Sequence, residues 1–292
     1  MTCLGPGPRN RVYLFKTSQT KSFMIIRTKP DKELKTQNSV VEEIKRVKLG
    51  ETWFYVKFYK PSNFNPRKRY PVVFDVYGGP TMNKVSTKYK VGYDHYFAGR
   101  YNTIVVTMDV RGTPGRSDNF QRAIYKKFGT VEVTDSIEVI KWVSREPYID
   151  SSRMGIMGAS YGGYLVLKII EAEPKLFVAA VSSAAVSNWR WYDTAYTERF
   201  MGLYDRMVYE RASVVPDLKK IPNNVLLLLH GLSDTNVLIR HHWAVVRELN
   251  LRHKIYSHYV KPGQTHRLKR LFHTLLWFRK RLWNRGRRCR FG

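Results

Sequence analysis

The chain has 292 residues, enough to bury one substantial core, and 43% of them are hydrophobic, which excludes an intrinsically disordered chain. No run reaches the roughly 20 apolar residues that a membrane-spanning helix needs. The formal net charge is +28, from 51 Lys and Arg against 23 Asp and Glu, and the last acidic residue is Glu248.

Residues 1–38 differ in character from the rest of the chain. Two short strands with polar turns are predicted within residues 11–39, followed by a linker rich in Lys, Thr and Asn. This segment is too short to bury a core of its own, so we predict that it belongs to a separate β unit. The opening MTCLGPGPRNRVYLF has no apolar core of signal-peptide type.

From residue 52 onward, short apolar strands alternate with helical patterns. Nearly continuous apolar runs of this length are typical of strands covered on both faces of a parallel sheet. The predicted strands lie within 70–79, 102–112, 153–160, 177–184, 223–231 and 254–263, and the predicted helices within 133–146, 161–173, 239–251 and 267–282. This alternation predicts an α/β fold with a mostly parallel, doubly wound sheet.

The segment MGASYGGYLVL, residues 157–167, places Ser160 between glycines where a predicted strand passes into a helix. One interpretation is a tight turn whose glycines supply backbone freedom. The other is a nucleophile elbow, which holds a serine up for attack on a carbonyl. Functional groups gather at the carboxyl ends of the strands in such a sheet, so the position favours the elbow of an α/β-hydrolase fold.

A serine hydroxyl needs a base, and the base needs an orienting acid. In this fold the order along the chain is Ser, then Asp or Glu, then His. Asp234 follows the predicted strand VLLLLHG, and His266 follows the next one, just ahead of a helix. Asp234 taken alone would be a turn residue, and the other histidines are expected to pack or to lie on the surface.

Acyl transfer also needs donors for the developing oxyanion. One expected donor is the backbone amide of Tyr161, the residue after the nucleophile. The other comes from the loop YGGP, residues 77–80, where the hydroxyl of Tyr77 could donate. The alternative for this loop is a simple Gly-Pro turn.

The segments DVYGGP, GTVEVTDSIEVIKW, GASYGGY, VSNWRWYDTAYTERFMG and HGLSDTNV together resemble the catalytic domain of the dipeptidyl peptidase IV family, in the prolyl oligopeptidase group of serine peptidases. The resemblance covers roughly residue 40 to the end. The opening TCLGPGPRNRVYLF is similar to the last part of that family's β-propeller. The implied organisation is a propeller remnant and linker at 1–38 and a peptidase domain of α/β-hydrolase fold at 39–292.

Carried over by position, the resemblance implies that Ser160, Asp234 and His266 form the triad, with Tyr77 and the Tyr161 amide as oxyanion donors. Asn236 is implied to hydrogen-bond the substrate backbone, and Arg111 to support the site rather than touch the substrate. The residues implied to line the pocket for a proline ring are Tyr161, Val186, Trp189, Tyr192, Tyr196 and Val237. The alternative for the tract WRWYDTAY is an aromatic core.

The chain departs from the family pattern at several points. Ala159 precedes the serine where this branch usually has Trp. The strand after the elbow, LFVAAV, lacks the cysteine that pairs with a C-terminal cysteine in extracellular members, so Cys289 lacks that partner. Cys3 and Cys289 could pair only if the termini meet. The resemblance also leads us to expect that the propeller, which in relatives carries the glutamates for the substrate's free amine, is missing from this chain.

Together with the order of Ser160, Asp234 and His266 along the chain, the resemblance implies a serine-type peptidase that uses an acyl-enzyme and no metal or other cofactor. It implies release of N-terminal dipeptides with proline or alanine in the second position. The alternatives are a catalytically impaired homologue acting as an interaction protein, or a broader oligopeptidase or acyl hydrolase. The resemblance also implies a homodimer and a location at the plasma membrane or outside the cell. The cytoplasm is the alternative, because this chain shows no signal or anchor.

The positive charge is concentrated at the carboxyl end, where residues 279–292 read RKRLWNRGRRCRFG. We interpret this run mainly as a solvated helix end and terminus, although anionic surfaces could bind it through counterion release. No zinc-ligand spacing, RNA-binding sheet signature or helix-turn-helix accompanies it. No specific nucleic-acid partner is therefore expected.

Overall fold

The computed structural model describes residues 11–14, 24–27, 40–88 and 91–283. In chain order, the strands are β1 (Arg11–Leu14), β2 (Met24–Arg27), β3 (Val41–Leu49), β4 (Thr52–Lys60), β5 (Tyr70–Val76), β6 (Ile104–Asp109), β7 (Ile149–Ala159), β8 (Ala179–Ser183), β9 (Leu226–Gly231) and β10 (Ser257–Lys261). The helices are α1 (Tyr93–Tyr101), α2 (Asp118–Arg122), α3 (Val131–Ser144), α4 (Tyr161–Ala172), α5 (Thr194–Met201), α6 (Arg206–Ala212), α7 (Arg240–Leu251) and α8 (Leu271–Phe278). Three short helical segments are η2 (Trp189–Trp191), η3 (Val215–Lys220) and η4 (Arg279–Trp283).

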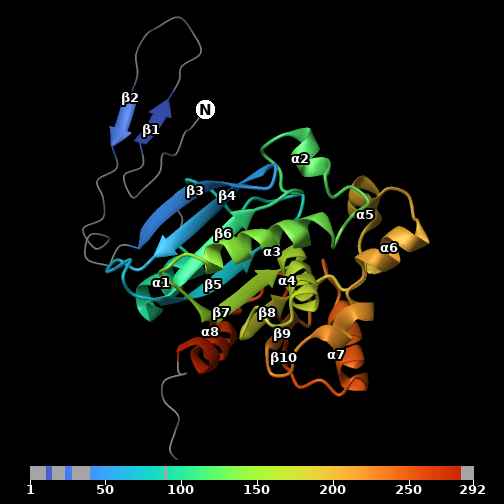
Figure 1. Cartoon of the computed structure of the whole chain (residues 1–292). Coiled ribbons are helices and arrows are strands. Elements are labelled where there is room, and N and C mark those ends of the chain that lie inside the picture. The colour runs from blue at the N-terminus through green and yellow to red at the C-terminus, as the bar shows by residue number, and fades with distance from the viewer. Residues whose placement is uncertain (1–10, 15–23, 28–39, 89–90, 284–292) are drawn as a thin grey trace, which may run out of the picture.

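The central sheet has eight strands in the order β10-β9-β8-β7-β5-β6-β4-β3 (Figure 1). The strands from β10 to β6 are parallel to their neighbours, and β4 and β3 are added antiparallel at one edge. The mostly parallel, doubly wound sheet predicted from the sequence is confirmed, and with it the α/β-hydrolase fold.

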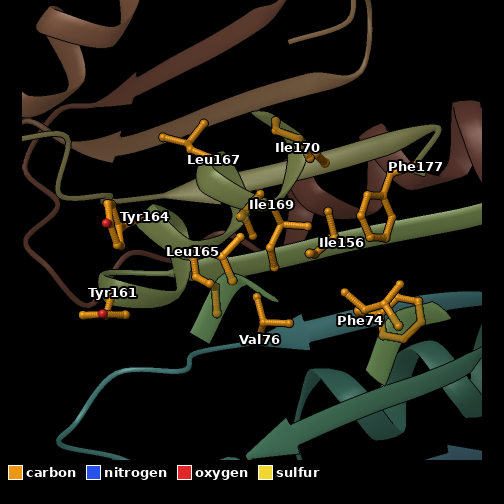
Figure 2. Packing of buried hydrophobic residues seen from close by; sticks show 14 of the residues in the cluster. Phe74, Val76, Ile156, Tyr161, Tyr164, Leu165, Leu167, Ile169, Ile170 and Phe177 are labelled. Carbon is orange, nitrogen blue, oxygen red and sulfur yellow. The ribbon is translucent and has the colours of Figure 1, made fainter. Parts of the chain in front are cut away.

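Two separate cores cover the two faces of this sheet, because side chains alternate along each strand. On β5, Val72 and Phe74 belong to one core, together with residues of α3 and α4 (Figure 2). Val73, between them, belongs to the other, which includes Phe97 of α1 and Phe278 of α8. Full burial of each such side chain contributes about 1.5–3 kcal/mol. This double coverage explains the continuous apolar runs in the sequence.

The two edge strands differ from the prediction. β10 was expected to be covered on both faces, but Tyr259 on it is 51% exposed, because β10 lies at the edge of the sheet with β9 as its strand neighbour. β3 was not predicted as a strand. Its apolar residues Val41, Ile44 and Val47 recur every third residue rather than every second, and most of the strand is exposed.

The amino-terminal strands β1 and β2 pair antiparallel, with Arg11 opposite Arg27 and Leu14 opposite Met24. This confirms the two short strands expected there. The domain boundary at residue 38 and the propeller remnant stay predictions, because residues 1–10, 15–23 and 28–39 lie outside the described ranges. Cys3, Cys289 and most of the basic end also lie outside them.

Within the described ranges, no helix combines the length and the apolar character that crossing a membrane requires. The parallel strands all end on the same side of the sheet, and the loops after β5, β7, β9 and β10 lie at this carboxyl-terminal end. These loops contain Tyr77, Ser160, Asp234 and His266, so the fold brings the predicted site residues together at the carboxyl-terminal end of the sheet.

Candidate active site

Ser160 lies in the turn between β7 and α4, and its backbone has φ 59° and ψ −122°. A positive φ is uncommon for a residue with a side chain and costs on the order of 1–3 kcal/mol. Two backbone hydrogen bonds hold the turn: Ser160 N donates to Ser183 O at 2.9 Å, and Tyr164 N donates to Ser160 O at 3.1 Å. The serine is therefore held in a strained conformation at the tip of a strand-to-helix turn.

The glycines on either side allow this turn because backbones meet there. A Cβ atom on Gly158 would lie 2.2 Å from the carbonyl oxygen of Gly162, and one on Gly162 would lie 2.3 Å from that of Val76. Neither approach leaves room for a side chain. The local geometry is that of a nucleophile elbow, in which close packing of strand and helix presents the serine.

Asp234 and His266 come together from the ends of β9 and β10. Nδ1 of His266 lies 2.8 Å from Oδ2 of Asp234, and Oδ1 of Asp234 accepts hydrogen bonds from the amides of Asn236 and Val237, both at 2.9 Å. A proton on Nδ1, donated to the carboxylate, leaves Nε2 of His266 as the basic nitrogen. The carboxylate thus both orients the ring and selects its tautomer.

The electrostatics favour an ionised Asp234. Burial alone would raise its pKa, but the hydrogen bond and charge of His266 and the two backbone amides hold the pKa below its ordinary value. His230, near the end of β9, contacts the loop that carries Asp234. Its Nε2 is 2.7 Å from the carbonyl oxygen of Val237 and 3.6 Å from Oδ2 of Asp234, and burial lowers its pKa. His230 was expected to pack or to lie on the surface, and its contact with Asp234, four residues later, was not predicted.

A cavity of about 380 Å³ opens at the carboxyl-terminal end of the parallel strands. Its lining residues are Tyr77, Thr81, Met82, Ser160, Tyr161, Val186, Trp189, Tyr192, Tyr196, Asn236 and His266. Ser160 and His266 therefore share one cavity, although no hydrogen bond joins their side chains in the described part of the chain. Such contacts are often long before substrate binds.

One wall of the cavity is aromatic. The rings of Trp189 and Tyr196 are stacked, with centroids 5.9 Å apart and planes at 6°, and Tyr192 meets Tyr196 edge-on at 5.2 Å. Tyr192 also donates a hydrogen bond to Oδ1 of Asn236 at 2.7 Å, which leaves the Asn236 amide group for other acceptors. This wall offers flat apolar faces with a polar group at its rim.

Tyr77 and Tyr161 face the same cavity with different groups. Tyr77 Oη lies 2.9 Å from Thr81 Oγ1, and burial raises the pKa of Tyr77, so its hydroxyl stays protonated and able to donate. Tyr161 is the first residue of α4, where a backbone amide has no acceptor within its own helix. Its phenol donates instead to the buried Glu132 at 2.8 Å.

The remaining predicted residues lie outside the cavity wall. Val237 is fully buried behind it. Arg111 makes three hydrogen bonds to Asp135, from its backbone amide at 3.1 Å, from Nε at 2.8 Å and from an Nη atom at 2.6 Å.

Three residues at the site were not predicted from the sequence. Thr81 and Met82 directly follow the YGGP loop, and Glu132 lies in the segment GTVEVTD. Thr81 and Met82 belong to no motif that marks a cavity wall, and the contact of Glu132 with Tyr161 joins residues that are 29 positions apart.

Residues 89–282 match the model of the prolyl oligopeptidase family. The chain is 33% identical to dipeptidyl peptidase 4 of Sus scrofa over 243 residues, which cover 81% of this chain and 32% of that protein. It is 36% identical to the "Probable dipeptidyl-aminopeptidase B" of Aspergillus oryzae over 215 residues, 72% of this chain and 24% of that protein. The chain thus spans about a quarter to a third of the length of these relatives.

A crystal structure of a dipeptidyl aminopeptidase IV-type protein from Bacteroides ovatus has the same fold. It superimposes with a TM-score of 0.87 at 23% sequence identity, and the match covers 95% of this chain and 41% of the other.

Proposed function

Since this chain belongs to the prolyl oligopeptidase family, we propose that it is the catalytic part of a serine peptidase that releases N-terminal dipeptides with proline or alanine in the second position. The observation that supports this most is the Asp234–His266 pair at 2.8 Å, in a cavity that also holds the elbow serine. The aromatic wall supports the preference for proline, because a rigid apolar ring fits between flat aromatic faces.

In the proposed reaction, Ser160 Oγ attacks the substrate carbonyl while Nε2 of His266 takes its proton. Asp234 stabilises the imidazolium that forms, and the Tyr161 amide and the Tyr77 hydroxyl stabilise the oxyanion. The C–N bond then breaks as His266 gives the proton to the departing amine, leaving the dipeptide esterified to Ser160. Water, activated by His266, hydrolyses this ester and restores the free serine.

A fluorophosphonate probe tests the nucleophile directly, because it phosphonylates an activated serine. The folded parent should be labelled at Ser160, and Ser160→Ala should not be. A parent that folds and stays unlabelled would contradict the proposal.

The substrate class is tested with an Ala-Pro reporter peptide and a simple ester, both cleaved through Ser160. The ester needs the serine, the base and the oxyanion donors but little of the pocket. Tyr192→Ala should therefore lower the prolyl-peptide rate about 10²-fold more than the ester rate, because small misplacements of the carbonyl are costly. Tyr192→Phe keeps the ring but removes the hydroxyl that donates to Asn236, so it separates the role of the ring from that of the hydroxyl. Equal losses with both substrates would assign Tyr192 to the core.

The same assay separates the alternatives. Labelling and ester cleavage without cleavage of the prolyl reporter would indicate a broader acyl hydrolase. Labelling without turnover of either substrate would indicate an impaired homologue. A homodimer and a location at the plasma membrane or outside the cell stay predictions.

A further inference from the structure

Glu132, in the first turn of α3, is completely buried. Its Oε1 accepts two hydrogen bonds, from the hydroxyl of Tyr161 at 2.8 Å and from the amide of Gly129 at 2.6 Å. No ion pair of the described residues includes Glu132, and its Oε2 has no hydrogen-bond partner among them. A buried carboxyl without a cation is costly, so its retention needs an explanation.

The partner, Tyr161, has two functions in the proposed site. Its backbone amide is an oxyanion donor, and its ring is part of the cavity wall. Tyr161 lies at the start of α4, among the buried residues of the core (Figure 2). The ring packs against Trp189, with centroids 5.4 Å apart, and against Tyr77, at 6.0 Å. Only two side-chain torsions separate the Tyr161 ring from its backbone. A hydrogen bond that fixes the hydroxyl therefore restrains both the ring and the backbone amide.

The second donor ties Glu132 to another part of the cavity. Gly129 follows Phe128, whose ring meets Tyr161 edge-on at 5.2 Å and Trp189 at 4.8 Å. One carboxyl oxygen therefore joins the turn before α3 to the first turn of α4, and the aromatic rings of the wall lie around that junction.

We propose that Glu132 is a positioning residue of this peptidase: its carboxyl holds Tyr161 so that the amide after Ser160 and the ring in the cavity wall stay in their working positions. This inference rests on the proposed function. Burial raises the pKa of Glu132 and outweighs the hydrogen-bond donors that lower it, of which the Gly129 amide and the Tyr161 hydroxyl have the largest effects, so the uncharged carboxyl is favoured. Glutamine is then the closest replacement, because its Oε1 can accept both hydrogen bonds.

The test compares Glu132→Gln, Glu132→Leu and Tyr161→Phe with the parent. Glu138→Leu is the matched control, the same change at an exposed position of the same helix. Turnover of the Ala-Pro reporter and of the ester is measured per serine labelled by fluorophosphonate, so that unfolded molecules do not count. Tyr161→Phe breaks the same hydrogen bond by a milder change, in case Glu132→Leu does not fold.

We expect Glu132→Leu and Tyr161→Phe each to lower kcat by roughly tenfold or more, since displacement of catalytic groups by 1 Å can cost about 10²-fold. Both substrates should be affected, because both use the oxyanion donor, and KM for the ester should change little. Glu132→Gln should stay within about threefold of the parent, as should Glu138→Leu. The double variant Glu132→Leu/Tyr161→Phe should be no slower than the worse single variant, because both remove one interaction.

Full kcat per labelled serine in Glu132→Leu and Tyr161→Phe would overturn the inference. So would a Glu132→Gln variant as slow as Glu132→Leu, or losses that multiply in the double variant. A parent that is neither labelled nor active would contradict the proposed function instead. The same double-mutant cycle, measured in the free energy of unfolding, would then decide whether Glu132 restrains Tyr161, and additive effects there would overturn that contact.

Discussion

Asp234 links the ends of two strands, since its two carboxyl oxygens have different partners. Oδ1 is held by the amides of Asn236 and Val237 in its own loop, and Oδ2 faces Nδ1 of His266 from the loop after β10. The first oxygen therefore fixes the carboxylate in place, and the second orients the imidazole ring. A single-atom change can separate these two roles.

Asp234→Asn should keep the fold and lower turnover by about 10⁴, the loss known for the equivalent change in a serine-protease triad. If Oδ1 of the asparagine keeps the two backbone amides, its NH₂ group faces His266 Nδ1 and selects the tautomer that cannot accept the serine proton. Turnover of the ester and the thermal unfolding midpoint are measured together. Retention of more than about a tenth of the parental rate in a folded variant would mean that another carboxylate orients His266.

Tyr77→Phe tests the second oxyanion donor by removing one hydroxyl and keeping the ring. The hydroxyl contacts Thr81 Oγ1 at 2.9 Å, so a structural role would lead to little change in rate. Loss of an oxyanion donor costs roughly 10²–10³ in kcat. The effect should appear in kcat more than in KM, because the oxyanion exists only in the transition state. Thr81→Val, which removes the partner instead, is the control; unchanged kcat in Tyr77→Phe would return the loop to a simple turn.

At the scale of secondary-structure elements, α4 determines where Ser160 lies. Nearly every residue of this helix is buried, and Leu165 and Ile169 pack in the core on the sheet face (Figure 2). Its first turn approaches the strands so closely that Gly162 would contact the carbonyl oxygen of Val76 through any Cβ atom. The position of the elbow therefore depends on backbone packing between α4, β5 and β7.

Gly162→Ala should destabilise the protein by about 1–3 kcal/mol, the usual range for overpacking, and should lower labelling of Ser160. Helix propensity alone predicts the opposite, because alanine is favoured over glycine by about 1 kcal/mol inside a helix. Gly99→Ala in α1 is the matched control, since its Cβ would meet only Val40 Cγ2 at an ordinary 3.6 Å. Urea unfolding measures both; a stabilised Gly162→Ala variant would show that the helix can move away from β5 at little cost.

At the scale of the whole molecule, a group of charges connects segments on the face opposite α3 and α4. Asp75 at the end of β5 pairs with Lys84 in the following loop. Burial, and then the charge of Asp75, raise the pKa of Asp94 in α1 to about 7, although Lys84 and Arg270 act in the opposite direction. Arg270 directly precedes α8 and follows His266 in the same loop, so this group of charges joins β5, α1 and the loop after β10.

Stability should consequently fall as the pH rises from about 5 to 8. The pKa of Asp94 is about 7 in the folded state and near 3.9 in an unfolded chain. Between these two pH values the folded state binds more protons than the unfolded state, so the free energy of unfolding falls as the pH rises. Asp94→Asn removes this contribution. Between pH 5 and 8 the parent should lose roughly 2 kcal/mol relative to the variant, since one pKa unit corresponds to about 1.4 kcal/mol.

Urea unfolding at the two pH values measures the difference, and Asp118→Asn, at an exposed position of α2, is the control. Parallel pH dependence of the parent and Asp94→Asn would exclude Asp94 as its source.

Features that depend on neighbours along the chain could be predicted from the amino-acid sequence. Continuous apolar runs identified the buried parallel strands, because both faces of such strands need apolar cover. Glycine spacing identified the turn at Ser160, and chain order selected Asp234 and His266. Local patterns carry this information because backbone conformation and strand burial constrain consecutive residues.

Contacts between groups far apart along the chain come from tertiary packing. Packing places Asp234 2.8 Å from His266 and Glu132 2.8 Å from Tyr161, and it makes β3 an edge strand despite its helix-like apolar spacing. Glu132 and Tyr161 are 29 residues apart, so no periodicity along the chain relates them. Such contacts follow from how α3 and α4 pack on the sheet, and a buried carboxyl looks in the sequence like any solvated one.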